Sequence, residues 1–527
     1  MGRTRDVVPW WSWLSYAALM AWAAVRWDSG LSPPALGQDD LWVAFVIKYA
    51  TSGDLLIYEA PIPMGFVAAQ QLVSPWFSNA QLSMQIVPFL CGLAVIPLAG
   101  WATSQITRRW ELGLVAGALV MLIPELGLFS VRVKQFTWDA AAMLALLAIG
   151  APHLDPDEPD RPERLSFAAA VILLFSFNTI FLGVVLCHVR VLMSAYHRQS
   201  LRRAVLAALA YDLFALALYT FRLDAQSADW IVHYWQKWYG FPPQAPSWEN
   251  GLQLDWARRA AGRAYLTWLP RPLRAWTVLA PVGLATLFLA RRTRWLGLAL
   301  TGGAAALLVA ALLLLYPHGG GRTDFFFKPM LAVLSAVAFG TATRWVGSAL
   351  ERLGLGAARA RTATILVALV TTGLLFLERP KGPVIYGTGK MTTLYRQLVS
   401  KMDSMAGPDD LILISRASRW NVGYYTALPI DADFATPVGR LFDFHATSPD
   451  LRVVTDITRD LEDDARERIV FVGLLEGQPR LRSFRRAFRA AGYKMGVRHV
   501  DEDRASGVFE FIRVDGRSPT PRAMTQP

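Results

Sequence analysis

Long apolar blocks separated by short polar connections dominate the first 377 residues of the chain. A helix of ~20 apolar residues is long enough to cross the ~30 Å hydrocarbon layer of a bilayer. We predict eleven membrane-spanning helices, over residues 10–26, 82–102, 111–130, 137–151, 166–178, 179–197, 203–221, 274–290, 295–316, 325–345 and 361–377. The pattern therefore predicts an α-helical polytopic membrane protein.

Basic residues gather in the short connections on one side of these segments. Because positively charged residues are enriched in cytoplasmic connections, we predict that this side and the N-terminus face the cytoplasm. The arginines concerned are Arg108, Arg109, Arg198, Arg202, Arg203, Arg291, Arg292, Arg294, Arg344 and Arg361. Arg3 and Arg5 precede the first segment, as in a signal peptide, but no small-residue cleavage site follows it, which favours an uncleaved anchor. The opposite side then carries a large first outer loop, residues 27–81.

From residue 378 the composition changes to that of a soluble domain. We therefore divide the chain into a transmembrane domain, residues 1–377, and a soluble domain, residues 378–516. Strands are predicted at residues 410–415, 469–473, 493–500 and 508–514, with helices at 389–406 and 478–492. This alternation predicts a small α/β domain. An odd number of spans places it on the outer side of the membrane, and the tail, residues 517–527, is predicted to be disordered.

Composition and charge limit the partners of the chain. Its 527 residues are 54% hydrophobic and carry a net charge of +12. This charge does not indicate nucleic acid, because it lies at the ends of the apolar segments, where it fits membrane topology and lipid headgroups. The two cysteines, Cys91 and Cys187, lie in apolar segments, so no disulfide framework is expected. The seven histidines show no metal-ligand spacing, and we predict no metal and no other cofactor.

Two adjacent carboxylates, Asp39 and Asp40, follow the first predicted span and precede an amphipathic run. A carboxylate beside the lipid surface is costly unless it has a function or a partner. An enzyme that acts on a lipid-linked substrate needs its catalytic base at such a position. Asp before a helix is also a common N-cap, so capping is the alternative for this pair taken alone.

Basic residues also occur on the predicted outer side, against the usual bias. Arg132 and Lys134 precede the fourth predicted span, and Arg322 precedes the tenth. Cations kept on this side indicate an anionic ligand, and arginine binds phosphate through paired hydrogen bonds. Contact of a long side chain with lipid headgroups is the alternative for each of these residues by itself.

The order of these elements resembles that of the GT-C class of membrane glycosyltransferases. The likeness is greatest to the group that contains the protein O-mannosyltransferases and the lipid A aminoarabinose transferase, and it covers roughly residues 10–345. The motifs that carry it are Asp39-Asp40, Pro61 with Pro63, Lys134-Gln135-Phe136 with Asp139, and Gly321-Arg322. Asp40 departs from the Asp-Glu pair that is commoner in the group.

The resemblance implies a GT-C-like fold and a donor in which a sugar is linked to a polyprenyl phosphate. In this assignment Asp39 is the catalytic base that takes the acceptor proton, with inversion at the sugar C1, and Asp40 orients Asp39 or the sugar. Arg322 and Lys134 bind the departing phosphate, with Arg132 as a further candidate. Residues near these motifs are substrate-binding candidates, namely Glu59, Asp139, Tyr316 and His318.

The expected partners are the polyprenyl-phosphate sugar donor, membrane lipids, and a glycan, lipid or protein acceptor at the outer face of a bacterial cytoplasmic membrane. A protein O-mannosyltransferase is one alternative, and a transporter or flippase of lipid-linked sugars is another. Transporters keep charges near the membrane midplane and often contain internal repeats. Here the charges lie at span ends and the two halves show no repeat. A related protein that has lost activity is the third alternative.

Several conspicuous sequences are given plainer interpretations. Asp155-Pro156-Asp157 and Asp431-Ala432-Asp433 are interpreted as solvated turns, because a proline lies in or just before each. The aromatic loop that includes Tyr234 and Trp235 is interpreted as part of the membrane interface, with stacking on a sugar as the alternative. Residues 420–425 are interpreted as a packed helix, with a helix that faces carbohydrate as the alternative.

Overall fold

The computed structural model describes residues 10–27, 31, 38–57, 62–158, 161–222, 229–237, 239–244, 246–247, 251, 253–319, 322–354, 356–378, 388–415, 418–438, 441–447, 449–454, 461, 466–473, 477–500 and 507–514. The chain forms two compact units. The first consists of Met1–Pro33 and Glu59–Ile385, and the second of Pro34–Tyr58 and Tyr386–Pro527. The segment that carries the acidic pair thus belongs to the same unit as the C-terminal region.

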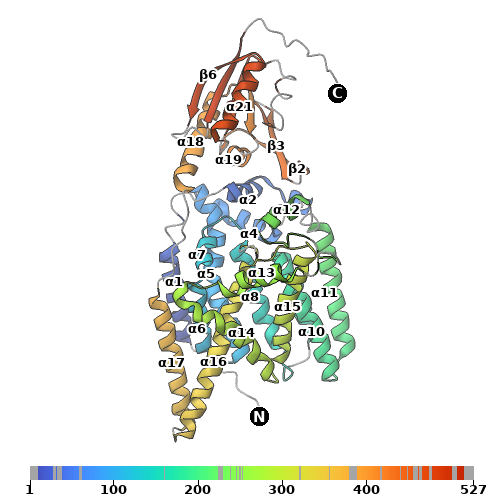
Figure 1. The fold of residues 1–527 in the computed structure, drawn as a ribbon, viewed down its shortest axis with the longest axis vertical. Coiled ribbons are helices and arrows are strands. Elements are labelled where there is room, and N and C mark those ends of the chain that lie inside the picture. Colours follow the sequence, from blue (N-terminus) through green and yellow to red (C-terminus); the bar gives the residue numbers. More distant parts are fainter. Residues whose placement is uncertain are drawn as a thin grey trace. The chain divides into compact units, whose positions relative to one another are not determined.

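The first unit is helical, and each predicted span falls on a helix or, for residues 111–130, on a bent helix pair (Figure 1). Its helices are α1 (Trp10–Trp27), α4 (Met64–Val73), α5 (Ala80–Thr107), α6 (Trp110–Met121), α7 (Pro124–Ser130), α8 (Phe136–His153), α9 (Pro162–Phe175), α10 (Ile180–Tyr196), α11 (Leu201–Arg222), α12 (Asp229–Lys237), α13 (Leu254–Leu266), α14 (Arg274–Leu289), α15 (Arg294–Leu312), α16 (Lys328–Arg352) and α17 (Ala357–Leu377). Short 3-10 turns lie before α10 (η3, Phe177–Thr179) and before α16 (η6, Phe325–Phe327).

Among the described residues, six helices have the length and composition of a membrane span, and the α6–α7 pair has the same length and composition when its two helices are taken together. The two helices of this pair are bent by 70°. The bend lies at Pro124, which has no backbone N–H to continue the hydrogen-bond ladder of α6. Residues 111–130 therefore form two helices joined at a sharp bend instead of the continuous helix expected from their hydropathy.

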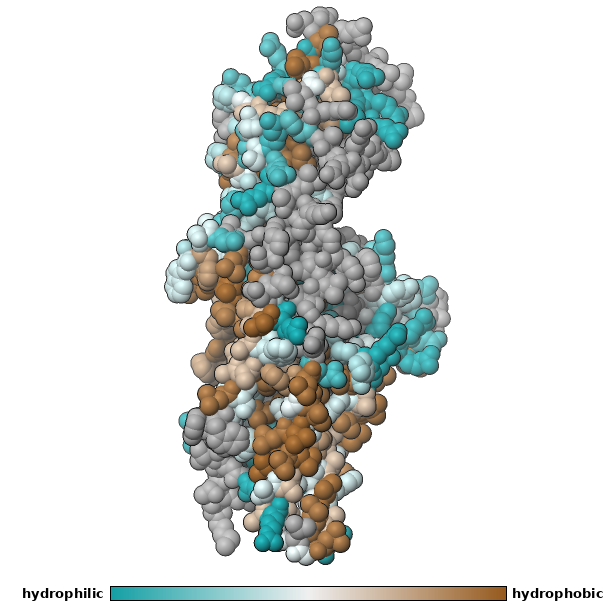
Figure 2. Space-filling model, turned by 90° about the vertical axis from the view of Figure 1, so that its left-hand side faces the viewer, coloured by the Kyte–Doolittle hydropathy of each residue, from teal (hydrophilic) through white to brown (hydrophobic). Residues whose placement is uncertain are grey.

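The surface of the first unit is that of a multi-pass membrane protein. Figure 2 shows hydrophobic residues over much of the helical unit. Large apolar side chains such as Leu213 and Leu374 are exposed on α11 and α17. Inside the unit, α14 and α16 approach closely at Gly283, where an added Cβ would lie 1.9 Å from the Leu334 carbonyl oxygen. Small residues allow such close backbone contact between membrane helices.

The second unit contains a seven-stranded mixed sheet with the strand order β2-β3-β4-β1-β5-β7-β6. Its strands are β1 (Leu411–Ser415), β2 (Asp431–Val438), β3 (Leu441–Thr447), β4 (Asp450–Val454), β5 (Arg468–Gly473), β6 (Tyr493–Val500) and β7 (Gly507–Arg513). Its helices are α2 (Gln38–Tyr49), α3 (Ser52–Ile57), α18 (Thr388–Met405), α19 (Arg419–Tyr425) and α21 (Gly477–Ala490). β1 pairs in parallel with β4 and β5, and the other pairings are antiparallel.

The four predicted strands and two predicted helices of this unit are present, and the α/β fold class is confirmed. β1 is buried along its whole length, as expected for a central parallel strand covered on both faces. On one face, α21 packs against the sheet, where the Phe488 and Phe511 rings stack with centroids 3.8 Å apart. The interpretation of Asp431-Ala432-Asp433 as a solvated turn was wrong, because these residues begin β2 at the edge of the sheet.

Candidate functional site

The first predicted basic motif forms a tight turn between α7 and α8. The Lys134 backbone N–H donates to the Arg132 carbonyl at 2.8 Å. Gln85 on α5 fixes the start of the turn by donating to the Val131 carbonyl at 2.6 Å. The hydroxyl of Thr137, just after the turn, donates to a carbonyl of α5 at 2.8 Å. Lys134 is buried in this arrangement and Arg132 is partly exposed, so α5 holds both cations at the start of α8.

Asp139, in the first turn of α8, is the centre of a buried polar cluster. Its two carboxylate oxygens accept hydrogen bonds from the Ser176 hydroxyl and the Asn178 amide, each at 2.7 Å. Tyr316 also lies beside this cluster and interacts with Asn178. Both oxygens of Asp139 therefore bind the chain's own connection between α9 and α10. The role of Asp139 and Tyr316 in substrate binding stays a prediction.

The second basic motif, around Arg322, follows a turn held by a buried acid–base pair. His318 Nδ1 and Asp324 Oδ1 lie 2.6 Å apart, and each side chain is only 1% exposed. The other Asp324 oxygen accepts the Gly319 backbone N–H at 2.7 Å. Gly319 has a φ of +80°, a left-handed conformation that side chains disfavour. This pair fixes the two ends of the turn, and the role of His318 in binding substrate remains a prediction.

Aromatic side chains of α12 hold Arg322 itself. The Arg322 guanidinium donates to the Tyr234 hydroxyl at 2.7 Å and lies 5.0 Å from the centroid of the Trp235 ring. This contact was not predicted, because 88 residues separate Tyr234 from Arg322. An arginine held on an aromatic surface keeps its planar fork in one orientation, which suits the binding of a phosphate group.

The two basic turns are joined by aromatic and ionic contacts between neighbouring helices. The Phe129 ring, three residues before Arg132, meets the edge of the Phe325 ring with centroids 5.0 Å apart. At the start of α16, the buried Lys328 donates to Glu125 of α7 at 2.5 Å. This ion pair was not predicted. The first unit therefore brings the segments that carry Lys134 and Arg322 against one common core.

An apolar groove of about 490 Å³ runs between α10, α11 and α15. Its lining includes Phe181, Leu216 and Ala310, and Asn178 and Tyr316 lie among its few polar groups. The Tyr316 hydroxyl donates to the Thr323 carbonyl at 3.2 Å. A residue of the groove's lining is therefore hydrogen-bonded to the residue that follows Arg322.

The acidic pair lies in the first turn of α2, in the second unit. Acidic side chains are favoured at this end of a helix, where the backbone N–H groups give a partial positive charge. Asp40 is fully buried, whereas the side chain of Asp39 and the whole of Glu59 lie outside the described residues. The structure therefore places the pair at the start of α2, and its catalytic role remains a prediction.

α2 packs against α19, which lies far from it in the sequence. Lys48 donates to the Tyr424 carbonyl at 3.0 Å, and the Tyr49 hydroxyl donates to the Gly423 carbonyl at 3.1 Å. A Cβ at Gly423 would lie 2.5 Å from the Phe45 ring, so only glycine fits this crossing. The prediction that residues 420–425 form a packed helix is confirmed.

Two polar residues of α19 lie on the face that approaches Asp40. Asn421 and Tyr425 are four residues apart and so share one side of the helix. Burial, with smaller effects of the neighbouring Tyr424 and Asp40, raises the pKa of the Tyr425 hydroxyl, which keeps it protonated at neutral pH. Both amide atoms of Asn421 and the Tyr425 hydroxyl are buried without a hydrogen-bond partner among the described residues. Such groups are uncommon in folded proteins and mark places where a ligand or water completes the bonding.

No group of three or more His, Cys, Asp or Glu side chains is placed to hold a metal ion in the part of the chain that the structure describes. The expectation that the chain needs no metal stays a prediction. The sites described above consist of carboxylates, cations and neutral hydrogen-bonding groups.

Comparison with known proteins identifies the fold. No protein-family model and no curated protein sequence matches the chain. Solved structures do match it. The crystal structure of ArnT from Cupriavidus metallidurans bound to undecaprenyl phosphate has a TM-score of 0.58 and 14% sequence identity, over 95% of this chain and 98% of that chain. The same protein without ligand gives a TM-score of 0.57 and 14% identity, over 94% and 97%.

These similarities show that the chain has a GT-C-like glycosyltransferase fold, as the order of its motifs predicted. The match extends over nearly the whole length of both chains, so it includes the C-terminal α/β region as well as the helices.

Proposed function

We propose that this chain is an integral membrane glycosyltransferase that moves a sugar from a polyprenyl-phosphate donor to a cell-envelope acceptor. The observation that carries the proposal is the apolar groove whose lining residue Tyr316 is hydrogen-bonded to Thr323, next to Arg322. A polyprenyl phosphate needs a long apolar surface for its chain and cations for its phosphate, next to each other. The ArnT structure with undecaprenyl phosphate supports this class of donor for the fold.

In the proposed reaction, Asp39 takes the proton of the acceptor hydroxyl as that oxygen attacks C1 of the sugar. The bond between C1 and the phosphate oxygen breaks, and the electron pair stays on the departing polyprenyl phosphate. Arg322 and Lys134 stabilise the negative charge that develops there, with Arg132 in support. A single displacement of this kind inverts the configuration at C1, and Asp40 orients Asp39 or the sugar.

The reaction is proposed to take place on the outer face of a bacterial cytoplasmic membrane. Arginines at the other ends of the helices support this orientation, because such residues are enriched on the cytoplasmic side. The acceptor is a hydroxyl of a glycan, a lipid or a protein.

The direct test uses the full chain reconstituted in nanodiscs. Polyprenyl phosphates carrying radiolabelled mannose, glucose, galactose or arabinose are supplied one at a time with a detergent extract of cell envelope. The expected result is release of polyprenyl phosphate and transfer of label to an acceptor for at least one donor. In proteoliposomes, movement of the donor across the membrane without its cleavage would instead indicate a flippase and would overturn the proposal.

The groove gives a prediction that concerns the lipid part of the donor. Replacing Ala310 with Trp fills the groove with an indole ring, so we expect the KM for a long-chain donor to rise about tenfold or more, because buried apolar area is lost. A donor with a short, water-soluble chain should be affected much less. Ala305→Trp adds the same ring to an exposed position of α15 outside the groove and serves as the control. Equal effects of the two variants on the long-chain donor would contradict this use of the groove.

The polar groups of α19 give a second prediction. We propose that Asn421 and Tyr425 bind hydroxyl groups of the sugar or the acceptor near the acidic pair. Asn421→Leu keeps the size of the side chain and removes two buried atoms without partners, so thermal stability should stay the same or rise. Transfer activity should nevertheless fall about tenfold or more, as expected when a hydrogen bond to substrate is lost.

Measurement of the melting temperature together with kcat/KM separates this role from a structural one. A purely structural Asn421 would lower both quantities or neither. Tyr425→Phe removes only the hydroxyl and should reproduce the loss of activity with the fold intact.

A further inference from the structure

A cluster of arginines lies at the other end of the helices from the Arg322 turn. It consists of Arg108 and Arg109 between α5 and α6, Arg292 before α15, Arg344 on α16 and Arg361 on α17. Arg344 follows Lys328 by 16 residues on α16, which corresponds to about 24 Å along the helix axis. We call this group the α5–α6 arginine cluster.

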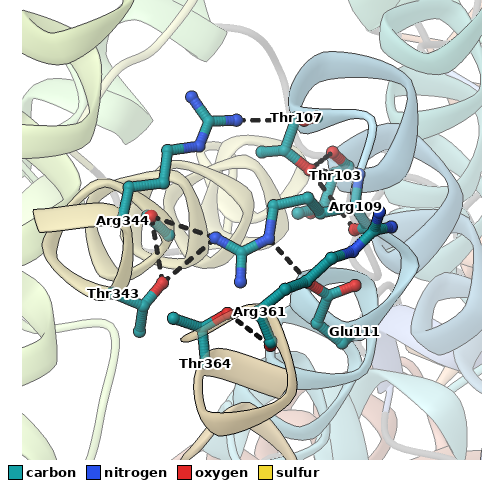
Figure 3. Close-up of polar contacts among 9 residues, drawn as sticks. Thr103, Thr107, Arg109, Glu111, Thr343, Arg344, Arg361 and Thr364 are labelled. Carbon is teal, nitrogen blue, oxygen red and sulfur yellow. Dashed lines mark hydrogen bonds and ion pairs between the residues drawn. The ribbon is translucent and has the colours of Figure 1, made fainter. Parts of the chain in front are cut away.

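Arg109 and Arg344 turn toward the junction of α5, α6 and α16 (Figure 3). Arg109 donates to Glu111 at 2.6 Å, to the Gly340 carbonyl at 3.3 Å and to the Thr343 hydroxyl at 3.1 Å. Arg344 donates to the Thr107 carbonyl, at the end of α5, at 3.2 Å. These contacts fix the guanidinium groups in place, so the cluster is a built surface and not a set of mobile side chains.

The carboxylates of this region are already engaged by other members of the cluster. Asp155 accepts from Arg292 at 2.5 Å and lies 3.5 Å from Arg108, which also pairs with Glu158 at 2.6 Å. The sequence interpretation of Asp155 as a solvated turn residue was wrong, because it is buried between these two arginines. Glu111, Asp155 and Glu158 therefore pair with Arg108, Arg109 and Arg292.

Arg344 lies close to other positively charged side chains. The charges of Arg109 and Arg292 act on it unfavourably, and Glu111 is the acid that acts against them. Its hydrogen bond is to a neutral carbonyl. Arg109 Nη2 is buried without a hydrogen-bond partner among the described residues. α6 begins at Trp110 with no side-chain cap, so the partial positive charge of its N-terminus adds to the same place.

Arg344 also lies beside side chains that suit contact with lipid. Trp345 and Val346, the next two residues of α16, are 73% and 53% exposed. Trp is enriched where the hydrocarbon meets the headgroups. Arg344 thus lies beside a side chain typical of the headgroup level, with apolar surface next to it for acyl chains.

We propose that the α5–α6 arginine cluster binds the phosphodiester headgroup of an anionic membrane lipid, on the membrane face opposite the Arg322 turn. The headgroup phosphate accepts hydrogen bonds from Arg344 and Arg109, which relieves the repulsion between like charges. This site is separate from the proposed donor site and does not depend on the proposed enzymatic activity.

The test measures the thermal stability of the full purified chain in a zwitterionic detergent as short-chain phosphatidylglycerol is added. Phosphatidylglycerol should raise the melting temperature, and phosphatidylcholine of the same chain length should not. In Arg344→Gln, the phosphatidylglycerol concentration for half of the effect should increase about tenfold, as expected for the loss of a charge-assisted hydrogen bond. Arg359→Gln removes an exposed arginine of α17 and should behave like the unmodified chain.

The melting temperature without added lipid shows whether the Arg344→Gln protein is folded. If it is lowered, Arg344→Lys, which keeps the charge but not the planar fork, replaces it and should show an intermediate affinity. An equal loss in the Arg359 control would indicate general attraction to the basic surface and would overturn the proposal. Equal stabilisation by soluble glycerol phosphate would overturn the assignment to a lipid.

Discussion

The Asp39→Asn variant is expected to lose sugar transfer by a factor of about 10²–10⁴ in kcat, the contribution typical of a positioned general base. The amide has almost the same shape as the carboxylate, but it cannot accept the proton of the attacking hydroxyl. Binding of the donor should change little, because Asp39 is proposed to act on the acceptor. The measurement is the rate of label transfer at saturating donor, with the protein reconstituted at the same level as the unmodified chain.

Asp409→Asn is the matched control for this variant. Asp409 is an exposed carboxylate in the same compact unit, so its loss should leave transfer unchanged. Asp40→Asn tests the second acid of the pair and should cost less than Asp39→Asn if it only orients its neighbour. Full activity of the Asp39→Asn protein would remove Asp39 from the mechanism.

The Arg322→Gln variant is expected to lose about 10²–10³ in kcat/KM, because removing one donor that stabilises transition-state charge has effects of this size. Its partners Tyr234 and Trp235 remain in place, so the loss reports on the guanidinium itself. Arg322→Lys should recover only part of the activity, since an ammonium group cannot form the paired contacts of the planar fork. Separate values of kcat and KM, with a range of donor concentrations, give the measurement.

Arg263→Gln provides the comparison for Arg322. Arg263 on α13 also lies against an aromatic ring, that of Tyr239, and bonds the carbonyl of the same residue. It has no proposed contact with the donor, so its loss should alter kcat/KM by less than about threefold. Similar losses for the two arginines would indicate a general effect of charge and not a phosphate site.

The helix positions in the first unit could be predicted from hydropathy, because a membrane span requires an apolar block of about 20 residues that is easily identified in a sequence. The long apolar blocks identified the places of the spans, and Pro124 shows why one of them breaks. The strands β2, β3 and β4 were missed. Two of them, β2 and β3, lie toward one edge of the sheet and contain charged or small residues, such as Asp431 and Asp433, that resemble a turn.

Some residues of the candidate site could likewise be predicted from the sequence, and others could not. Arg322, Lys134 and Asp139 could be identified because their motifs occur in an order that resembles a known fold. Their partners could not, since Tyr234, Ser176 and Asn178 approach them only after distant segments pack together. No local pattern distinguishes an Asn that will hold a buried carboxylate from one in an ordinary turn. The unpaired polar atoms of Asn421 likewise become visible only once its surroundings are known.

The joining of α2 to α19 has a consequence for the engineering and evolution of this chain. The helix with the acidic pair, α2, lies early in the chain, yet its residues Phe45, Lys48 and Tyr49 contact residues of α19 that lie more than 370 positions later. A chimera that exchanges only the C-terminal region with that of a relative would therefore disrupt the contacts between α2 and α19. A functional hybrid should require that α2 and the C-terminal region are exchanged together. Substitutions at the contacts between α2 and α19 should occur in pairs during evolution.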